Sequence, residues 1–448
     1  MKRTTLIAIL FIVTTIVAHA ASISVEVKNP SNFKRTSVPV VMSLSEYGTV
    51  RSALVSDAGN NTAVACQLDD LNQDGLMDEL CFLVDLSAKE KRTFTVTMSE
   101  GYDLASANGS KPTTPAGVYV EMLLSNKKVK EENKHDLYIS QLTVDRGVNP
   151  YNQLHHHGAA FENELVAYRI YFDHRQTVDI YGKYHRQLEL RQTQFYPDET
   201  QKQTGFGDDV LWVGNTFGLG TLCGYDGQQP TMLYDVLHRS QRILARGPLR
   251  TIVEVTDEGW LPNAPAPSPT EIADAQLLQM EQRVTLTTRY TLYANRRDCF
   301  VEVEVKPLMA KQKTTLPRFS TGIINVKESE EFSDHHGLRG CWGTDWPVSA
   351  KDSVGHKRET VGLGICLPAE NIVGEWPADK DNYGYEISMS YGRKLCYAIS
   401  FCSDNEDFGY HSATEWFDYL KQWKRELAKA VEIRIKPTPS LPKGGGLE

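Results

Sequence analysis

The stretch Val166-Ala-Tyr-Arg-Ile-Tyr-Phe-Asp173, followed by Val178-Asp-Ile-Tyr-Gly-Lys183, alternates apolar and polar side chains. A period of two is typical of a strand that buries one face. A short polar turn joins the two stretches, which predicts an antiparallel hairpin in which Asp173 pairs with Asp179. The apolar face of its first strand consists of Val166, Tyr168, Ile170 and Phe172.

The other face of this predicted hairpin brings acid, base and cation together. Three histidines, His155–His157, and two glutamates, Glu162 and Glu164, precede it and are expected at its rim. So many titratable groups in one place favour a catalytic site, with cross-strand polar pairs on a solvated face as the alternative. The polar face consists of Arg169, Tyr171, Asp173, Asp179, Tyr181 and Lys183.

Three of these side chains suit the β-elimination of a 4-linked uronate. That reaction needs a cation to neutralise the carboxylate, a base to remove the C5 proton and an acid for the leaving oxygen. We assign Arg169 to the carboxylate, Tyr171 or His157 to the base and the acid, and Lys183 to a supporting role. The substrate-binding candidates on the same face are Tyr181 and Asp173.

Glu162 and Glu164 offer a different chemistry. Glycoside hydrolysis uses two carboxyl groups roughly 5 to 10 Å apart, and two residues apart on a strand is close to that separation. An ordinary pair of solvated carboxylates at the start of a strand is the alternative interpretation of these two residues.

Two histidine-glycine elements occur, His155-His-His-Gly158 and Asp334-His-His-Gly337. Adjacent residues of an extended chain point to opposite sides, so three histidines in a row do not easily close on one metal ion. His156 and His157 are better suited to proton transfer near neutral pH, and a surface histidine run is the alternative. If both elements meet at one end of the fold, the second supplies substrate-binding candidates, namely His335, His336, Trp342 and Trp346.

Residues 70–79, Asp-Leu-Asn-Gln-Asp-Gly-Leu-Met-Asp-Glu, resemble the first half of an EF-hand calcium loop. The twelfth position of such a loop would be a glutamate but is Cys81. We therefore expect an Asx-rich hairpin turn, with a calcium ion as the alternative and no other cofactor. The oxygen ligands of that calcium ion would come from Asp70, Asn72, Asp74 and Asp78.

The N-terminus has the features of a secretory signal peptide, residues 1–20, with Lys2 and Arg3 before an apolar run and Ala20 at its end. No cysteine follows the predicted cleavage site, so we expect a periplasmic or secreted protein without a lipid anchor. No later apolar run approaches the roughly 20 residues of a membrane helix. Loss of Lys2 and Arg3 would take the formal charge from −9 to −11, which argues against a nucleic-acid partner.

Short β-type runs between Gly, Asn and Asp clusters predict a small sandwich over residues 21–100. A linker follows over 101–117, and strand patterns then dominate 118–436, which predicts one large double-layered sandwich before a flexible tail, 437–448. Ser412 and Glu415 match a helix capping box. The fold is therefore predicted as all-β with one C-terminal amphipathic helix. The apolar stripe of that helix consists of Trp416, Leu420, Trp423 and Leu427.

The chain has eight cysteines but no CxxC pair, which excludes zinc-ribbon and thioredoxin-like sites. Cys66 and Cys81 flank a turn and could face each other across a hairpin. An oxidising compartment would permit a disulfide between them, but a chain of this size does not need one, and two buried thiols are favoured.

Several segments resemble an uncharacterised family of secreted proteins from glycan-degrading Gram-negative bacteria. They are NPSNFKRTSVPVVMSL at 29–44, QLDDLNQDGLMDELCFL at 67–83, residues 155–183 and GFGDDVLWVG at 205–214. The resemblance implies a genomic setting of uronic-acid polysaccharide breakdown, without an activity. RGPLRTIVEV at 246–255 and VTLTTRYTLYANRRDCFVEVEV at 284–305 look like strands of galactose-mutarotase-like supersandwich proteins. That fold hosts lyases, hydrolases, epimerases and binders alike.

The residues and the resemblance together predict a periplasmic carbohydrate-active enzyme on uronate-containing oligosaccharides, with a β-elimination lyase as the leading hypothesis. The enzymatic rival is a glycoside hydrolase that uses Glu162 and Glu164. The rival from another class is a non-catalytic glycan-binding protein, in which Trp342, Trp346 and Trp376 stack on sugar rings.

Overall fold

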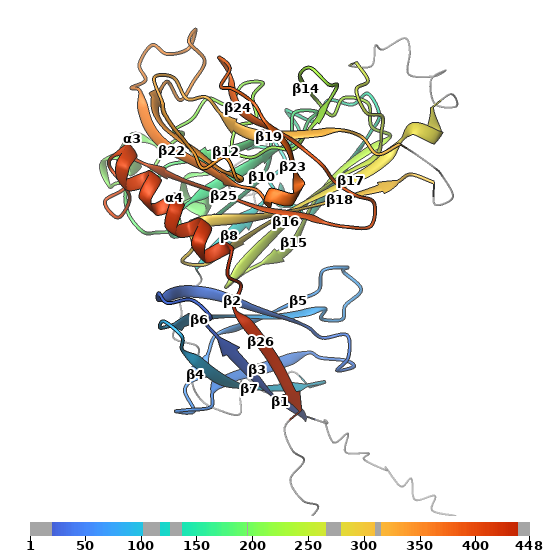
Figure 1. Ribbon diagram of the computed structural model, residues 1–448, viewed down its shortest axis with the longest axis vertical. Coiled ribbons are helices and arrows are strands. Elements are labelled where there is room, and N and C mark those ends of the chain that lie inside the picture. Colours follow the sequence, from blue (N-terminus) through green and yellow to red (C-terminus); the bar gives the residue numbers. More distant parts are fainter. Residues whose placement is uncertain are drawn as a thin grey trace, which may run out of the picture.

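The structure, a computed structural model, describes residues 20–101, 117–125, 137–194, 196–265, 279–309 and 315–437. These residues form five antiparallel sheets in two units, a small one and a large one (Figure 1). The all-β prediction is confirmed. The predicted signal peptide lies outside the described residues apart from Ala20, as do most of the predicted linker and tail.

The small unit is a sandwich of two sheets. Alternating apolar residues such as Val25, Val40, Phe82 and Phe94 point between the sheets and are fully buried. One sheet has the order β26 (Glu432–Pro437), β1 (Ala20–Lys28), β7 (Lys91–Ser99), β3 (Ser52–Asp57) and β4 (Ala63–Val64). The other has the order β2 (Arg35–Ser43), β6 (Glu79–Leu86) and β5 (Cys66–Asp69).

One expectation about this unit is wrong, and the preference for two thiols over a Cys66–Cys81 disulfide is confirmed. The sequence patterns assign the C-terminal strand β26 to the large unit, whereas it returns to the small one and pairs with β1, Val25 opposite Ile435 (Figure 1). The cysteines do not face each other, because Cys66 lies opposite Phe82 and Cys81 lies opposite Gln67. Neighbouring residues of a strand point to opposite faces, so Cys66 and Cys81 are on different faces and are free thiols.

The large unit is built on a nine-stranded sheet whose strands are mostly sequential hairpins. Its long central strands alternate buried and part-exposed residues, as the period-two patterns predict. The order is β20 (Glu330–Ser333), β21 (Leu338–Asp345), β22 (Glu359–Cys366), β25 (Leu395–Ser403), β18 (Asp298–Pro307), β17 (Val284–Tyr293), β16 (Arg250–Trp260), β15 (His238–Arg246) and β9 (Gln141–Asp145).

A second layer covers this sheet and consists of two smaller sheets. One has the order β12 (Val178–Tyr181), β11 (Ala167–Tyr171), β10 (Gly158–Asn163) and β8 (Val118–Glu121). The other has the order β14 (Pro230–Thr231), β13 (Cys223–Tyr225), β19 (Phe319–Ile324), β24 (Asn382–Ile387) and β23 (Ile372–Glu375). Bridges from Val178 to Gly218 and from Leu219 to Ile323 join the two sheets.

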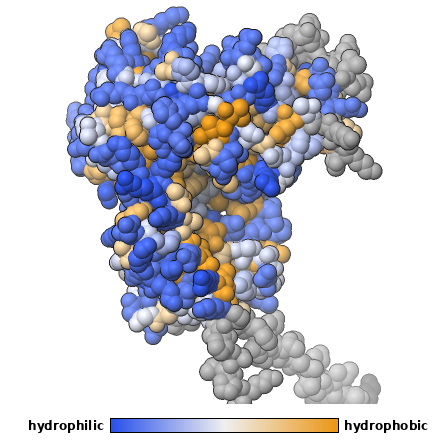
Figure 2. Space-filling model, viewed as in Figure 1, coloured by the Kyte–Doolittle hydropathy of each residue, from blue (hydrophilic) through white to orange (hydrophobic). Residues whose placement is uncertain are grey.

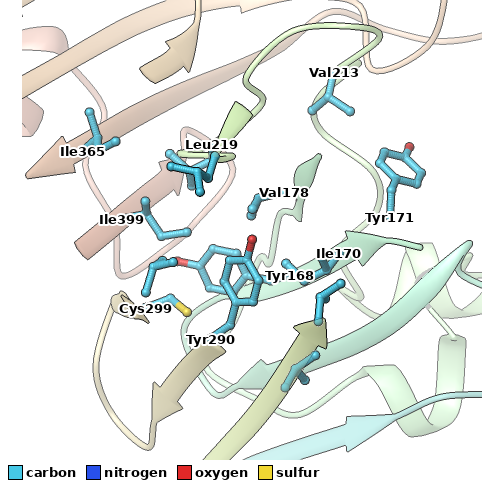
Figure 3. Close-up of a cluster of buried hydrophobic side chains, with 14 of the residues drawn as sticks. Tyr168, Ile170, Tyr171, Val178, Val213, Leu219, Tyr290, Cys299, Ile365 and Ile399 are labelled. Atoms are coloured by element: carbon cyan, nitrogen blue, oxygen red, sulfur yellow. The ribbon is translucent and has the colours of Figure 1, made fainter. Parts of the chain in front are cut away.

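The core of the large unit lies between these layers. Tyr168, Ile170 and Val178 of the four-stranded sheet pack in one cluster with Tyr290 and Ile399 of the nine-stranded sheet (Figure 3). The predicted apolar face of Val166, Tyr168, Ile170 and Phe172 is confirmed, since all four are fully buried. The opposite, polar face of the same strands therefore points away from the core.

The predicted C-terminal helix is α4 (Ala413–Leu427). The Ser412 side chain accepts a hydrogen bond from the Glu415 amide, as in a capping box. The second bond differs from the predicted box, because the Glu415 side chain accepts from the amide of His411, one residue before Ser412. Trp416, Leu420 and Trp423 are buried, so the stripe packs on the sandwich. The short helices, which the sequence did not predict, are α2 (Leu190–Thr193), α3 (Glu199–Gln203), η2 (Met280–Gln282) and η3 (Ala369–Asn371).

The two units are joined by buried polar contacts. Arg250 of β16 forms ion pairs at 2.7 Å with both Asp69 and Glu79 of the small unit. The Gln67 amide donates to the Arg250 carbonyl at 3.0 Å. The visible surface of both units is mostly hydrophilic with separate apolar patches (Figure 2). Within the described ranges, the helices are too short or too polar to cross a membrane.

Candidate active site

The polar face of the four-stranded sheet carries the chemistry that the sequence indicated. Hydrogen-bond register places Glu121, Ala160, Arg169 and Asp179 in one row across the four strands. The expected pairing of Asp173 with Asp179 is wrong, because Asp179 lies opposite Arg169. The shift is by an even number of residues, so the polar side chains still share one face.

Arg169 is the centre of this face and is only 5% exposed. Its Nε and Nη2 donate to Asp179 Oδ2 at 2.9 and 2.6 Å, and Nη2 also donates to the Tyr171 hydroxyl at 2.8 Å. Its Nη1 donates to the hydroxyl of Tyr196 at 2.9 Å. Tyr196 is 47% exposed, so this bond connects the buried guanidinium to the protein surface.

The charge state of this cluster follows from its burial. Burial opposes the charge on Arg169 and by itself lowers its pKa. The interactions with Tyr181, whose ring centroid lies 5.2 Å from the guanidinium carbon, and with Asp179 outweigh this effect and raise the pKa of Arg169. Burial also raises the pKa of Tyr171, which stays a neutral phenol. Asp209 lies 3.6 Å from Arg169, and burial together with Asp179 raises the pKa of Asp209.

His157 lies next to this cluster, and its ring is in the neutral, basic form. Its ring stacks on Tyr151 at 3.8 Å between centroids and lies 6.0 Å from the Tyr171 ring. Nδ1 is 2.7 Å from the Tyr151 carbonyl oxygen, which can only accept, so Nδ1 carries the proton and Nε2 keeps a lone pair. Burial lowers the pKa of His157, which keeps the ring neutral at neutral pH.

Asp173 lies in the turn after β11 instead of on the sheet face. Its carboxylate accepts from Arg175 Nη2 at 2.5 Å and from the Arg175 amide at 2.8 Å. The Arg175 guanidinium covers the rings of Tyr151 and Tyr171, each at 4.8 Å. Asp173 is thus placed to hold Arg175 over the aromatic rings next to His157.

His156 turns inward and pairs with a glutamate. Its Nε2 is 3.0 Å from Glu121 Oε1, and both side chains are buried. Burial raises the pKa of Glu121 to about 7 and lowers the pKa of His156 to about 3, so the histidine is neutral. The ring of His155 lies against Tyr196, with 5.8 Å between centroids. The three histidines therefore have three different environments.

Lys183 lies inside the protein, where it forms an ion pair with Glu162. Its Nζ also donates to the Gln187 carbonyl at 2.7 Å. Glu162 is fully buried and accepts from the amides of Glu189 and Leu190 at 2.8 and 2.7 Å. Both side chains hold α2 against the sheet, and neither is placed to contact a substrate.

Glu164 lies beyond the end of β10, away from Glu162. It accepts from the Asn295 amide at 3.0 Å and borders a cavity of about 520 Å³ between the two units. With Glu162 enclosed and Glu164 at the junction, the two glutamates do not flank a common space, so the geometry does not support their pairing in hydrolysis.

The two histidine-glycine elements lie against different parts of the large unit. His156 of the first element contacts Glu121 of β8. In the second element, Lys424 of α4 donates to the His336 carbonyl and to Asp334, each at 2.6 Å. His335 is exposed, with Nδ1 3.3 Å from Glu375 of β23. The expected meeting of these two elements is therefore not what the structure shows.

The tryptophans proposed as sugar platforms are also separated. Trp342 packs against the cluster around Trp416 of α4, and Trp376 packs on Tyr225 at 4.9 Å. Trp346 follows β21 and is half-buried. These three side chains belong to different contacts and do not form one stacking surface.

The acidic loop between β5 and β6 is an Asx-rich turn. Asp70 accepts from the amides of Gln73 and Gly75 at 2.7 and 2.8 Å, and Asp78 accepts from the Leu71 amide at 2.7 Å. Asn72 and Asp74 accept from backbone amides as well. In the described part of the chain, no group of three or more His, Cys, Asp or Glu is placed to hold a metal ion.

Calcium binding by Asp70, Asn72, Asp74 and Asp78 stays the alternative to be tested. Because the loop oxygens already accept backbone amides, we expect the turn to form without metal. Calorimetric titration with calcium after chelation should show no heat of binding and no change in melting temperature. A measured heat together with a raised melting temperature would contradict this and establish a site.

The sequence did not single out several residues of the site. Glu121, Tyr151 and Tyr196 come from loops or a strand with no unusual spacing. Asp209 had a signal, since it lies in GFGDDVLWVG, one of the segments that resemble the uncharacterised family, but that resemblance implies no role for it. Only the fold brings these side chains to the Arg169 face, because they are 18 to 48 residues away from Arg169 in the chain.

The fold and the site can now be compared with known proteins. Residues 27–433 match DUF4861, a domain of unknown function. The chain belongs to the DUF4861 family. The match runs through both units, so the DUF4861 domain contains the small sandwich and the large one. No curated protein matches the chain.

Solved structures resemble the DUF4861 domain only distantly. One is a protein in glycosyl hydrolase family 38 from Enterococcus faecalis, with TM-score 0.46 and 12% identity over 93% of this chain and 47% of that chain. Another is an alpha-mannosidase from Enterococcus faecalis V583, with TM-score 0.43 and 12% identity over 93% of this chain and 46% of that chain. The chain spans about half the length of these proteins.

Proposed function

We propose that the protein is a periplasmic carbohydrate-active enzyme that cleaves 4-linked uronate oligosaccharides by β-elimination. The observation that carries this proposal is the position of a neutral histidine, His157, near a buried guanidinium, Arg169, whose Nη1 donates to the hydroxyl of an exposed tyrosine. This arrangement supplies a base and a carboxylate-binding cation on one sheet face.

Substrate binding begins at Tyr196. Its hydroxyl accepts from Arg169 Nη1 at 2.9 Å, where a uronate carboxylate would make a stronger, charge-assisted bond. Because Tyr196 is exposed, it can turn away and leave Nη1 to the substrate. Asp179 and Tyr171 then keep the guanidinium in place from the other side.

The chemical step needs a base at C5. Nε2 of His157 has the lone pair to take this proton, and the electrons of the C5–H bond form the C4–C5 double bond as the C4–O bond breaks. Arg169 stabilises the negative charge that develops on the carboxylate. Tyr171 is bound to Arg169 and Asp179 through its hydroxyl, so it positions the guanidinium and is not the base.

The test is the product from 4-linked uronate oligosaccharides. Elimination leaves a double bond next to the carboxyl group, which absorbs in the near ultraviolet, whereas hydrolysis does not. His157→Asn should lower the rate about 10²- to 10⁴-fold, the usual loss for a general base. Asparagine tolerates the positive φ of 58° at this position, so the fold should persist.

The matched control is His238→Asn, an exposed histidine of β15 paired with Asp145, which should keep the wild-type rate. Equal rates for both variants would exclude His157 as the base. Binding of the oligosaccharides without any product would instead support a non-catalytic glycan-binding protein.

The pH dependence of kcat/KM should reflect the same base. His157 acts only when neutral, and its pKa is lowered by burial, so activity should rise with pH and reach half its maximum below the usual histidine value of about 6.5. A pH–rate profile measured with the uronate oligosaccharide checks this. A half-maximum above that value would contradict the assigned environment of His157.

A further inference from the structure

A cavity of about 240 Å³ is lined in part by Asp209, a neighbour of Arg169. Loops 182–184, 202–210 and 347–359 enclose it, and the proposed elimination does not yet use it. Its polar lining includes Tyr184, Lys202, Asp209, His356 and Lys357. Asp209 is the member of this lining that also reaches the Arg169 cluster, at 3.6 Å from Nη2.

The backbone fixes Asp209 at this position. The Gly182 amide donates to the Asp208 carbonyl at 3.1 Å, and Asp209 forms a bridge with Tyr181 at the end of β12. A Cβ at Gly207 would lie 1.8 Å from the Gly182 carbonyl oxygen, so this close approach of the two segments requires glycine. The GFGDDV segment therefore delivers Asp209 to one defined place.

Two carboxyl groups share the one guanidinium there. Asp179 is 1% exposed and takes the short bond to Arg169, whereas Asp209 is 21% exposed and opens onto the cavity. One positive charge does not balance two neighbouring negative charges, so Asp209 keeps its proton, in line with its raised pKa. The geometry makes it a neutral carboxylic acid that faces a cavity.

The other charges around the cavity are paired. Lys202 lies 2.9 Å from Asp208, and Lys357 lies 3.4 Å from Glu359 and 3.3 Å from the Tyr184 hydroxyl. With His356, these are the titratable groups that face the cavity from the enclosing loops. A polar cavity with balanced charge suits a hydroxyl-rich sugar better than a second anion.

We propose that this cavity binds the sugar on the leaving-group side of the scissile bond and that Asp209 donates the proton which the departing oxygen requires. The inference rests on the elimination proposed above. As the C4–O bond breaks, the oxygen takes the proton of Asp209, which leaves a short-lived carboxylate 3.6 Å from Arg169. Asp209 regains a proton from solvent through the cavity after the sugar leaves, and His157 releases the proton it took from C5.

The test compares two leaving groups in wild type and Asp209→Asn. A 4-linked uronate disaccharide needs protonation of its leaving oxygen, whereas a uronate with a dinitrophenyl ether at O4 does not. Asp209→Asn should lower kcat for the disaccharide about 100-fold or more and leave the aryl ether nearly unchanged. Asp418→Asn, an exposed carboxylate of α4 paired with Lys421, is the matched control.

An infrared difference spectrum at neutral pH adds a readout that needs no turnover. Wild type should show the band of a protonated carboxyl group that Asp209→Asn lacks. No such band, or an equal loss on both substrates, would overturn the proton-donor role. If wild type processes neither uronate, the elimination itself fails, and this result is distinct from the other two. Should Asp209→Asn misfold, Asp209→Ser takes its place in the same assays.

Discussion

Lys183→Met should lower the free energy of unfolding by about 3–5 kcal/mol, the usual cost of leaving one member of a buried ion pair without its partner. Glu162 would remain as a charge in a fully buried position, with the amides of Glu189 and Leu190 as its remaining donors. Methionine preserves most of the lysine chain length, so the loss comes from the charge and not from a cavity. Urea unfolding monitored by circular dichroism measures it.

The matched control is Lys394→Met, which removes an exposed lysine paired with Glu302 and should cost less than about 1 kcal/mol. The double variant Lys183→Met with Glu162→Gln should recover part of the stability, because the amide keeps an acceptor for the two backbone donors. A Lys183→Met protein as stable as the control would show that this pair is not the structural element described here.

Arg169→Lys should reduce kcat/KM for elimination about 100-fold or more. Lysine keeps a positive charge but lacks the planar fork that reaches Asp179, Tyr171 and the substrate carboxylate at once. Arg169→Ala is less informative, because it leaves Asp179 buried without a cation, and a loss of activity would then include a loss of stability. Initial rates from the near-ultraviolet absorbance, with urea unfolding in parallel, separate the two effects.

Arg318→Lys is the control for this exchange, since Arg318 is exposed and pairs with Glu386 on another sheet of the large unit. It should keep the wild-type rate. If Arg169→Lys is folded and equally active, Arg169 is not the group that binds and neutralises the uronate.

The alternation in residues 166–183 predicted the buried face of the hairpin correctly, because side-chain direction in a strand is a local property. The polar face was predicted in part: Asp173 lies in the turn and Lys183 is enclosed with Glu162, whereas the remaining members lie together, namely Arg169, Tyr171, Asp179 and Tyr181. The pairing register of β11 and β12 is not such a local property. The sequence pattern predicts that Asp173 pairs with Asp179. In the structure Asp173 lies in the turn after β11, where it accepts a hydrogen bond from Arg175, and Arg169 lies opposite Asp179.

The contacts between residues far apart in the chain could not be predicted from the sequence, for a physical reason. Lys183 looked like a member of the polar face, yet the chain after β12 folds back and encloses it with Glu162. The strand β26 pairs with β1, which is more than 400 residues earlier, and the residues of β26 alone do not identify β1 as the partner strand. The partners Glu121, Tyr196 and Asp209 reach the site by the same long-range folding.

The account stands or falls on elimination at the Arg169 face. The most direct measurement is mass spectrometry of the products that wild type forms from a 4-linked uronate oligosaccharide. Elimination adds no water, so we predict an unsaturated product and a partner fragment whose masses sum to the mass of the substrate. Saturated products whose masses sum to the substrate plus one water would contradict elimination and show hydrolysis.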